Sequence, residues 1–144
     1  MKTVAQLISL KSERNVYTVA PEQMVIEAVR AMAERNVGAL PVIENGVVIG
    51  VISERDYARK MVLQGRSSAG TPIRSIMSSP VITVDPCQSI ETCMGLMTER
   101  HLRHLPVVEN ERLIGLLSIG DLVKAAITEQ ADLILHLEQY IRGH

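Results

Sequence analysis

Two short motifs place a hydroxyl side chain and a carboxylate three positions apart. Ser53 precedes Asp56 in the run GVISERD, and Ser118 precedes Asp121 in GLLSIGD. In each motif a β-rich run ends where a helix is expected to begin, so serine and aspartate together can cap the helix. The same geometry suits a ribonucleotide, because free N–H groups at a helix start bind phosphate and a fixed carboxylate accepts hydrogen bonds from two ribose hydroxyls. Capping alone and nucleotide binding both explain the motifs.

Basic residues surround the two motifs unequally. Arg55, Arg59 and Lys60 lie near the first motif, whereas Lys124 is the counterpart of Arg59 near the second. The pair Arg103-His104 precedes a β-rich run in the second half of the chain, where the first half has Gly-Ala. These local cationic clusters could meet a phosphate, although basic residues on a helix often form only a solvated face.

The sequence contains no recognisable catalytic constellation. It lacks a Walker A loop, a G-x-G-x-x-G run, a nucleophile elbow and an H-E-x-x-H motif. His101 and His104 have no third metal ligand nearby, which argues against a metal site. Cys93 falls in an apolar helical stripe and is expected in the core, and Cys87 has no basic neighbour to activate it. We therefore expect neither an enzyme nor a metal protein.

Composition narrows the partners further. The 144 residues are 47% hydrophobic but only 2% aromatic, and the formal net charge is −1. The core must then be aliphatic, and an aromatic-walled sugar or peptide groove is not expected. Neither nucleic acid nor an anionic membrane is an expected partner, because no strong field attracts them. Two cysteines do not make a disulfide framework, so a reducing cytoplasmic setting is the expectation.

An internal repeat sets the architecture. When the chain is shifted by 65 residues, residues 16–61 align with residues 81–126 without a gap. VYTVAPEQ meets VITVDPCQ, and MAERNVGALPVIENGVVIGVISERD meets MTERHLRHLPVVENERLIGLLSIGD. Each half is too small to bury its own sheet well, so the two should pack into one domain, with clefts between them.

Each copy has a β-α-β-β-α pattern. In the first copy, strands are predicted from β-rich runs at residues 16–19, 39–43 and 47–52. The apolar period of 3.6 predicts a helix at residues 24–35, and a final helix is expected at residues 54–63. The second copy predicts the same elements at residues 81–84, 90–100, 104–108, 113–117 and from residue 119 onward. Asn45-Gly46 is a strong hairpin signal, whereas Asn110-Glu111 at the matching place predicts another turn type.

The flanking segments complete this plan. Thr3 is expected to cap a short helix at residues 3–10, residues 64–71 form a loop, and residues 72–77 form a helical turn. A helix over residues 119–142 is too long for one compact repeat and should bend or pack on a partner. We divide the chain into residues 1–70, the first repeat with an N-terminal helix, and residues 71–144, the second repeat with a C-terminal helix.

These motifs together resemble a pair of CBS domains, named after cystathionine β-synthase and also called a Bateman module. The resemblance rests on the V-x-T-V-x-P openings, the RHLPVV run at residues 103–108 and the two G-h-h-S-x-x-D endings. It covers roughly residues 4–130 and is nearest to small stand-alone bacterial proteins. It implies an α/β (α+β) fold in which two pseudo-symmetric β-α-β-β-α repeats pack sheet to sheet.

The resemblance also implies ligands and site residues. Family members bind AMP, ADP or ATP and, in some cases, NAD(H) or S-adenosylmethionine, and they commonly form homodimers. Adenine would lie against the first β-rich run of a copy, ribose on the motif aspartate, and phosphate on the motif serine and nearby basic residues. The implied binding residues are Val16, Tyr17, Thr18, Ala39, Ser53, Arg55, Asp56, Val81, Ile82, Thr83, Arg103, His104, Pro106, Ser118 and Asp121. The first copy lacks the Arg-His pair, so the two clefts should be unequal.

Two functions from different classes follow. The first is a non-catalytic regulatory module that binds adenosine nucleotides and relays ligand state to an unidentified downstream protein. The second is an unliganded dimerisation or scaffold module in which the S-x-x-D motifs only cap helices. Nucleotide titrations of the wild type and of aspartate-to-asparagine variants separate the two.

Overall fold

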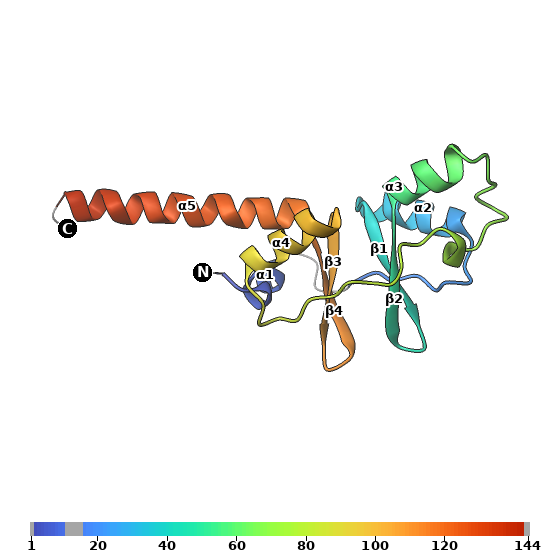
Figure 1. The fold of residues 1–144 in the computed structure, drawn as a ribbon, viewed down its shortest axis with the longest axis horizontal. Helices are drawn as coiled ribbons and strands as arrows, with labels where there is room; N and C mark the ends of the chain where they lie inside the picture. The colour runs from blue at the N-terminus through green and yellow to red at the C-terminus, as the bar shows by residue number, and fades with distance from the viewer. Residues whose placement is uncertain (1, 11–15, 143–144) are drawn as a thin grey trace.

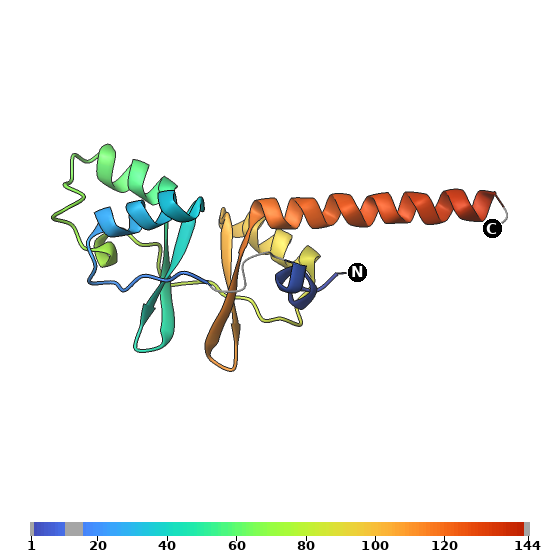
Figure 2. The same ribbon diagram turned by 180° about the vertical axis from the view of Figure 1, so that it is seen from behind.

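Two antiparallel hairpins form the centre of the molecule. The computed structural model describes residues 2–10 and 16–142. One hairpin joins β1 (Ala39–Glu44) to β2 (Val47–Ser53), and the other joins β3 (His104–Glu109) to β4 (Arg112–Ser118). The hairpins stand side by side with helices on their outer flanks (Figures 1 and 2). This arrangement confirms the predicted mixed fold of two repeats.

The helix of each repeat begins and ends at matching places. α2 spans Val25–Arg35, and α4 spans Ile90–Arg100. Each helix ends on a residue in the left-handed conformation, Asn36 at φ 54° and His101 at φ 55°, and that conformation stops the helical hydrogen bonds. The apolar period of 3.6 therefore located both helices correctly.

The predicted first strand of each repeat shrinks to a single parallel bridge. Val19 donates its N–H to the carbonyl of Pro41 and accepts from Ile43, with N···O distances of 3.1 and 2.8 Å. The rung before Val19 would need an N–H on Pro41, and the rung after it would need one on Pro21. Proline has no N–H, so the ladder cannot extend in either direction.

The same correction applies to the second repeat. Val84 donates to the carbonyl of Pro106 at 3.0 Å and accepts from Val108 at 2.9 Å. Pro86 and Pro106 remove the donors of the two adjacent rungs. The β-rich runs of both repeats are therefore extended segments that touch a sheet at one point.

The two hairpin turns are alike, and the prediction of a different second turn is wrong. Asn45 and Gly46 have φ values of 52° and 79°, and Asn110 and Glu111 have φ values of 50° and 66°. Two consecutive residues with positive φ make the turn whose twist matches the flanking strands. The sheet twist thus imposes the same turn on the second hairpin, even though glutamate is poorly suited to it.

The helices that follow the hairpins differ between the repeats. In the first repeat, α3 (Glu54–Asp56) passes into η1 (Tyr57–Val62), which has π-helical hydrogen bonds, so the predicted α-helix over residues 54–63 is only partly correct. In the second repeat, α5 runs without a break from Ile119 to Ile141. The helix projects beyond α4 and does not bend (Figure 1).

The buried side chains form two clusters, one for each hairpin. We call the cluster around β1 and β2 the first lobe and the cluster around β3 and β4 the second lobe. Both cores are aliphatic, as the composition predicted. Their largest fully buried members include Ile52 in the first lobe and Leu105, Leu117 and Leu122 in the second.

Each lobe is completed by the segment that precedes the other repeat. α1 (Val4–Leu10) buries Val4 and Leu7 in the second lobe, and η2 (Ile73–Ser75) buries Ile73 in the first lobe. The backbone bonds match as well, because Val4 donates to the carbonyl of Gln88 at 2.9 Å and Ile73 donates to that of Gln23 at 2.8 Å. We call α1 and the stretch 72–78 the leading segments, and they cross between the lobes.

Candidate functional site

Asp56 is held at the start of α3 by reciprocal hydrogen bonds with Ser53. The N–H and the hydroxyl of Ser53 both donate to Asp56 Oδ2 at 3.0 Å, and the N–H of Asp56 donates to the serine oxygen at 3.1 Å. Asp56 is only 8% exposed, the one buried charged residue in the described part of the chain. The motif therefore makes a capping box and also fixes a carboxylate at the edge of a cleft.

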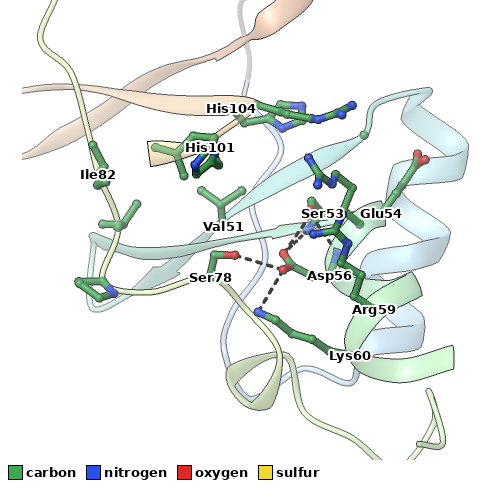
Figure 3. Close-up of a pocket in the computed structure, with 16 residues that line it drawn as sticks. Val51, Ser53, Glu54, Asp56, Arg59, Lys60, Ser78, Ile82, His101 and His104 are labelled. Atoms are coloured by element: carbon green, nitrogen blue, oxygen red, sulfur yellow. Dashed lines mark hydrogen bonds and ion pairs between the residues drawn. The ribbon is translucent and has the colours of Figure 1, made fainter. Parts of the chain in front are cut away.

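The second carboxylate oxygen has partners from farther along the chain. Ser78 donates its hydroxyl to Asp56 Oδ1 at 3.1 Å, and Lys60 Nζ lies 3.1 Å from the same oxygen (Figure 3). Lys60 also donates to the carbonyl of Ile76 at 2.9 Å. A carboxylate offers about four acceptor positions, so these donors occupy the whole group. A sugar hydroxyl can reach Asp56 only by replacing Ser78 or Lys60.

Positive charge gathers around this carboxylate from both lobes. Arg55 precedes Asp56 and Arg59 follows it on the first lobe, and Arg103 lies just before β3 on the second. The charge of Arg103, and then that of Arg59, lowers the pKa of the Arg55 guanidinium below its ordinary value. Burial lowers this pKa as well, and the charge of Asp56 opposes the shift with the smallest contribution. The three arginines therefore repel one another across a space that an anion would stabilise.

The Asp56 cleft is this space between the lobes. Its volume is about 460 Å³, which lies within the usual range for small-molecule pockets. Opposite the arginines its wall is aliphatic and includes Val51 on β2 and Ile82 on the first extended segment of the second repeat (Figure 3). His101 and His104 line the side nearest β3. An apolar wall facing a cationic wall suits a ligand with a flat apolar end and an anionic end.

A second cleft lies around Asp121 and is related to the first by the 65-residue repeat. Asp121 occupies the place of Asp56, Lys124 that of Arg59, and Ala125 that of Lys60. Ser118 donates its N–H to Asp121 Oδ2 at 2.8 Å, so this motif is also a capping box. The Asp121 cleft has a volume of about 550 Å³.

The walls of the two clefts differ in charge and in origin. Lys2 and the α1 residues Leu7 and Leu10 line the Asp121 cleft, whereas the Asp56 cleft has the extended stretch around Pro80 instead. Arg35 lines the Asp121 cleft, but its guanidinium lies 4.7 Å from the ring centroid of Tyr17, which attracts it. The Asp121 cleft therefore lacks the three-arginine cluster, in keeping with the expectation of unequal clefts.

The structure brings together about half of the residues that the sequence suggested. Those lining the Asp56 cleft are Ser53, Arg55, Asp56, Val81, Ile82, Arg103 and His104. Asp121 lines the other cleft, and Ser118 caps the helix beside it. The remaining suggested residues line neither cleft: Val16, Tyr17, Thr18, Ala39, Thr83 and Pro106.

Burial explains two of these exclusions. Ala39 and Pro106 lie in strands and are buried there, although neither belongs to the aliphatic core cluster of its lobe. Position 39 is the repeat counterpart of His104, and its short side chain is only 1% exposed.

The sequence interpretation also missed several cleft residues. Arg59, Lys60 and His101 line the Asp56 cleft but are not among the predicted binding residues. Ser78 is not among them either. It lies outside the aligned repeat and reaches Asp56 because its stretch pairs with β2 through Val51, with N···O distances of 2.9 and 3.2 Å. A serine followed shortly by a proline carries no signal for such a contact.

Neither a metal site nor a membrane span is found among the described residues. No group of three or more His, Cys, Asp or Glu side chains there could hold a metal ion. None of the helices in that part of the chain combines the length and apolarity needed to cross a bilayer.

Comparisons with known proteins agree with the fold. A CBS domain profile matches residues 6–63 and again residues 73–128. The mitochondrial CBS domain-containing protein CBSX3 of Arabidopsis thaliana is 41% identical over 127 residues, which are 85% of this chain and 62% of the relative. The chain thus spans less than two thirds of that relative's length.

Solved structures show the same architecture. A candidate signal-transduction protein with CBS domains from Burkholderia ambifaria superposes with a TM-score of 0.85 at 50% identity, covering 90% of this chain and 96% of that one. The CBS domain pair of protein MJ0100, solved with 5′-methylthioadenosine and S-adenosyl-L-methionine, superposes with a TM-score of 0.79. It is 21% identical and covers 90% of this chain and 98% of its own, so it is similar in fold alone. From the two profile matches and these relatives, the chain belongs to the CBS domain family and carries a pair of CBS repeats.

Proposed function

We propose that the protein is a non-catalytic regulatory module that binds an adenosine nucleotide in the Asp56 cleft. One observation carries the proposal: a fixed carboxylate, three mutually repelling arginines and an aliphatic wall surround one cleft between two lobes. The aliphatic wall suits a purine, the carboxylate suits ribose, and the arginines suit phosphate. The adenosine-type ligands of the MJ0100 pair support the choice of nucleoside.

The number of arginines favours more than one phosphate. Arg55, Arg59 and Arg103 are separate cations, and no carboxylate in the described part of the chain forms an ion pair with any of them. A single phosphate would relieve part of their mutual repulsion, and a di- or triphosphate would relieve more of it. We expect ADP or ATP to bind more tightly than AMP, and NAD(H) to compete for the same cleft.

Binding would couple the lobes, because the cations come from both of them. An anion held by Arg103 and Arg55 favours the arrangement in which these two residues approach each other. A ligand that prefers this arrangement shifts the module toward it, and a partner that reads the arrangement would sense the nucleotide. We propose such a downstream protein partner and a homodimeric state. A cytoplasmic location stays a prediction, and the Arabidopsis relative is by its name mitochondrial.

Calorimetric titration with AMP, ADP, ATP and NADH tests the proposal. Arg103→Gln should weaken ATP binding by about tenfold while leaving the fold intact, because this exposed side chain takes no part in capping. Arg112→Gln is the matched control, since it removes an exposed arginine that does not line the cleft. Adenosine without phosphate should bind more weakly than ATP and should be little affected by Arg103→Gln.

The two motif aspartates complete the test. Asp56→Asn should abolish most of the binding, and Asp121→Asn should leave the ATP site of the Asp56 cleft intact. A wild type that binds none of the four nucleotides, with both asparagine variants merely less stable, would contradict the proposal. The scaffold function would then stand, and the full set of donors on Asp56 in the free protein favours it as the alternative.

A further inference from the structure

An apolar stripe runs along the outer side of α5. Ile127, Ile134 and Ile141 recur at intervals of seven residues, Leu137 falls between the last two, and Val123 precedes the first by four residues. All five side chains are exposed, Ile134 by 57% and Ile141 by 82%. A seven-residue apolar repeat along one face is typical of helices that pair with another helix.

The stripe faces away from the lobe to which α5 belongs. Leu122 and Ala125 anchor the start of the helix in the second lobe, and their side chains are buried. At 100° per residue, Ile127 and Ile134 lie more than 100° around the helix from Leu122. The outer half of α5 extends past the rest of the molecule in both views (Figures 1 and 2). An exposed apolar face of this length marks an interaction site.

We propose that this stripe binds the same stripe of a second copy, with the two α5 helices antiparallel. In an antiparallel pair each isoleucine position faces a leucine-type position of the other helix. The longest such register sets Ile127 against the partner's Leu137 and Val123 against the partner's Ile141. All three isoleucines of the stripe are then covered, and Gln130 is its polar member.

Charge and size are complementary in this register. The two side chains that flank the stripe on one edge, Lys124 and Glu138, come opposite each other in the dimer: Lys124 faces the partner's Glu138, twice by symmetry. On the other edge Ala126 faces the partner's Tyr140, so a small side chain accommodates a large one. The exposed tyrosine, 81% accessible in the single chain, is thereby covered.

A parallel pair lacks this complementarity. Lys124 and Glu138 are 14 positions apart, about 21 Å along the axis at 1.5 Å per residue, so they would not meet. Glu138 would instead face the partner's Leu133. The flanking charges therefore select the antiparallel orientation.

Sedimentation of the full chain without nucleotide tests the interface. The wild type should be a dimer, and Ile134→Glu should raise its dissociation constant more than about 100-fold, because the dimer would bury a charged carboxylate in an apolar interface, with only the neutral side chain of the partner's Gln130 opposite it. Leu135→Glu is the matched control, because Leu135 is 52% exposed on the same helix but lies outside the stripe. A monomeric wild type would overturn the proposal and leave the stripe to another partner. A dimer unaffected by Ile134→Glu, or equally disrupted by both variants, would overturn it as well.

Charge reversal tests the orientation. Lys124→Glu and Glu138→Lys should each weaken the dimer about 2- to 10-fold, and the double variant should restore the wild-type affinity. Single reversals without effect, or a double variant no better than the singles, would overturn the antiparallel register.

The proposal rests on the proposed function only for the homodimeric state. ATP titration of the Ile134→Glu monomer keeps the two claims separate. If the Ile134→Glu variant is a monomer and still binds ATP, both the α5 interface and the nucleotide site are supported, and neither depends on the other. If the wild type is a dimer that binds no nucleotide, only the proposed function is contradicted.

Discussion

At the scale of single residues, Glu111 occupies a backbone conformation that glycine holds in the first hairpin. Its φ of 66° lies in the left-handed region, which costs a residue with a side chain roughly 1–2 kcal/mol. Gly46 holds the matching position at φ 79°. The two hairpins therefore compare glycine and glutamate at the same turn position.

We predict that Glu111→Gly stabilises the protein. The relief of steric cost exceeds the added entropy of glycine in the unfolded chain, roughly 0.5–1 kcal/mol, so the free energy of unfolding should rise by about 0.5–1 kcal/mol. Urea unfolding measures the change. Gly46→Glu is the reverse substitution and should lower stability by a similar amount. A stabilising Gly46→Glu would show that positive φ is not what limits this turn.

Some residues of the Asp56 cleft could be predicted from the sequence and others could not. Asp56 and Arg103 could be predicted because the repeat marks their positions and because their charges suit a nucleotide. Ser78 could not, since it meets Asp56 only through the pairing of its stretch with β2. Ala39 is only 1% exposed, and no pattern in the sequence showed that this position would be closed to solvent.

At the scale of elements, helices and hairpins followed from local patterns, and the exceptions have local causes. The apolar period of 3.6 located α2 and α4, and β-branched runs located the four strands. The predicted first strand of each repeat does not form, because proline removes the hydrogen bonds on both sides of Val19 and Val84. The π-helical turns of η1 leave no comparable mark in the sequence.

Gly50 and Gly115 hold matching places in β2 and β4 but face different neighbours. A Cβ on Gly50 would lie 2.9 Å from the backbone oxygen of Ser78 and 2.9 Å from Met77 Sδ. A Cβ on Gly115 would lie 2.9 Å from the Cδ1 atom of Ile8, the far end of a flexible side chain. The first contact is with rigid backbone, and the second can be relieved by rotation.

We predict that Gly50→Ala destabilises the protein more than Gly115→Ala does. Overpacking against backbone should cost about 1–3 kcal/mol at Gly50, and less at Gly115, where Ile8 can move aside. Thermal unfolding of the two variants measures the difference. Equal losses at both positions would mean that the stretch around Ser78 moves as freely as the Ile8 side chain.

At the scale of the whole molecule, neither repeat contains all of its own core. Ile73 and Ile76 are at most 1% exposed in the first lobe, and Val4 is fully buried in the second, although each lies on the other side of the repeat boundary in sequence. Loss of one such side chain costs about 2–5 kcal/mol, which approaches the whole stability of a small domain.

A chain cut in the loop at residues 64–71 should therefore not leave two folded halves. We predict that residues 1–65 and 66–144 are each without cooperative unfolding when alone, and that an equimolar mixture recovers it. Circular dichroism during urea unfolding provides the measurement. Insertion of a short Gly-Ser stretch at the same place, without the cut, should change stability little. Cooperative unfolding of the first fragment alone would show that its lobe does not need Ile73.

The crossed leading segments also bear on how such a chain could arise. A single repeat with the same contacts could complete its core only by trading its leading segment with a second copy, which is a domain-swapped homodimer. Joining two copies in one chain makes the trade intramolecular and independent of protein concentration. After duplication the two clefts no longer need identical lining residues, because a substitution in one repeat leaves the other repeat unchanged. The two clefts differ in this way, with Arg55, Arg59 and Arg103 around Asp56 and Lys2, Arg35 and Lys124 around Asp121.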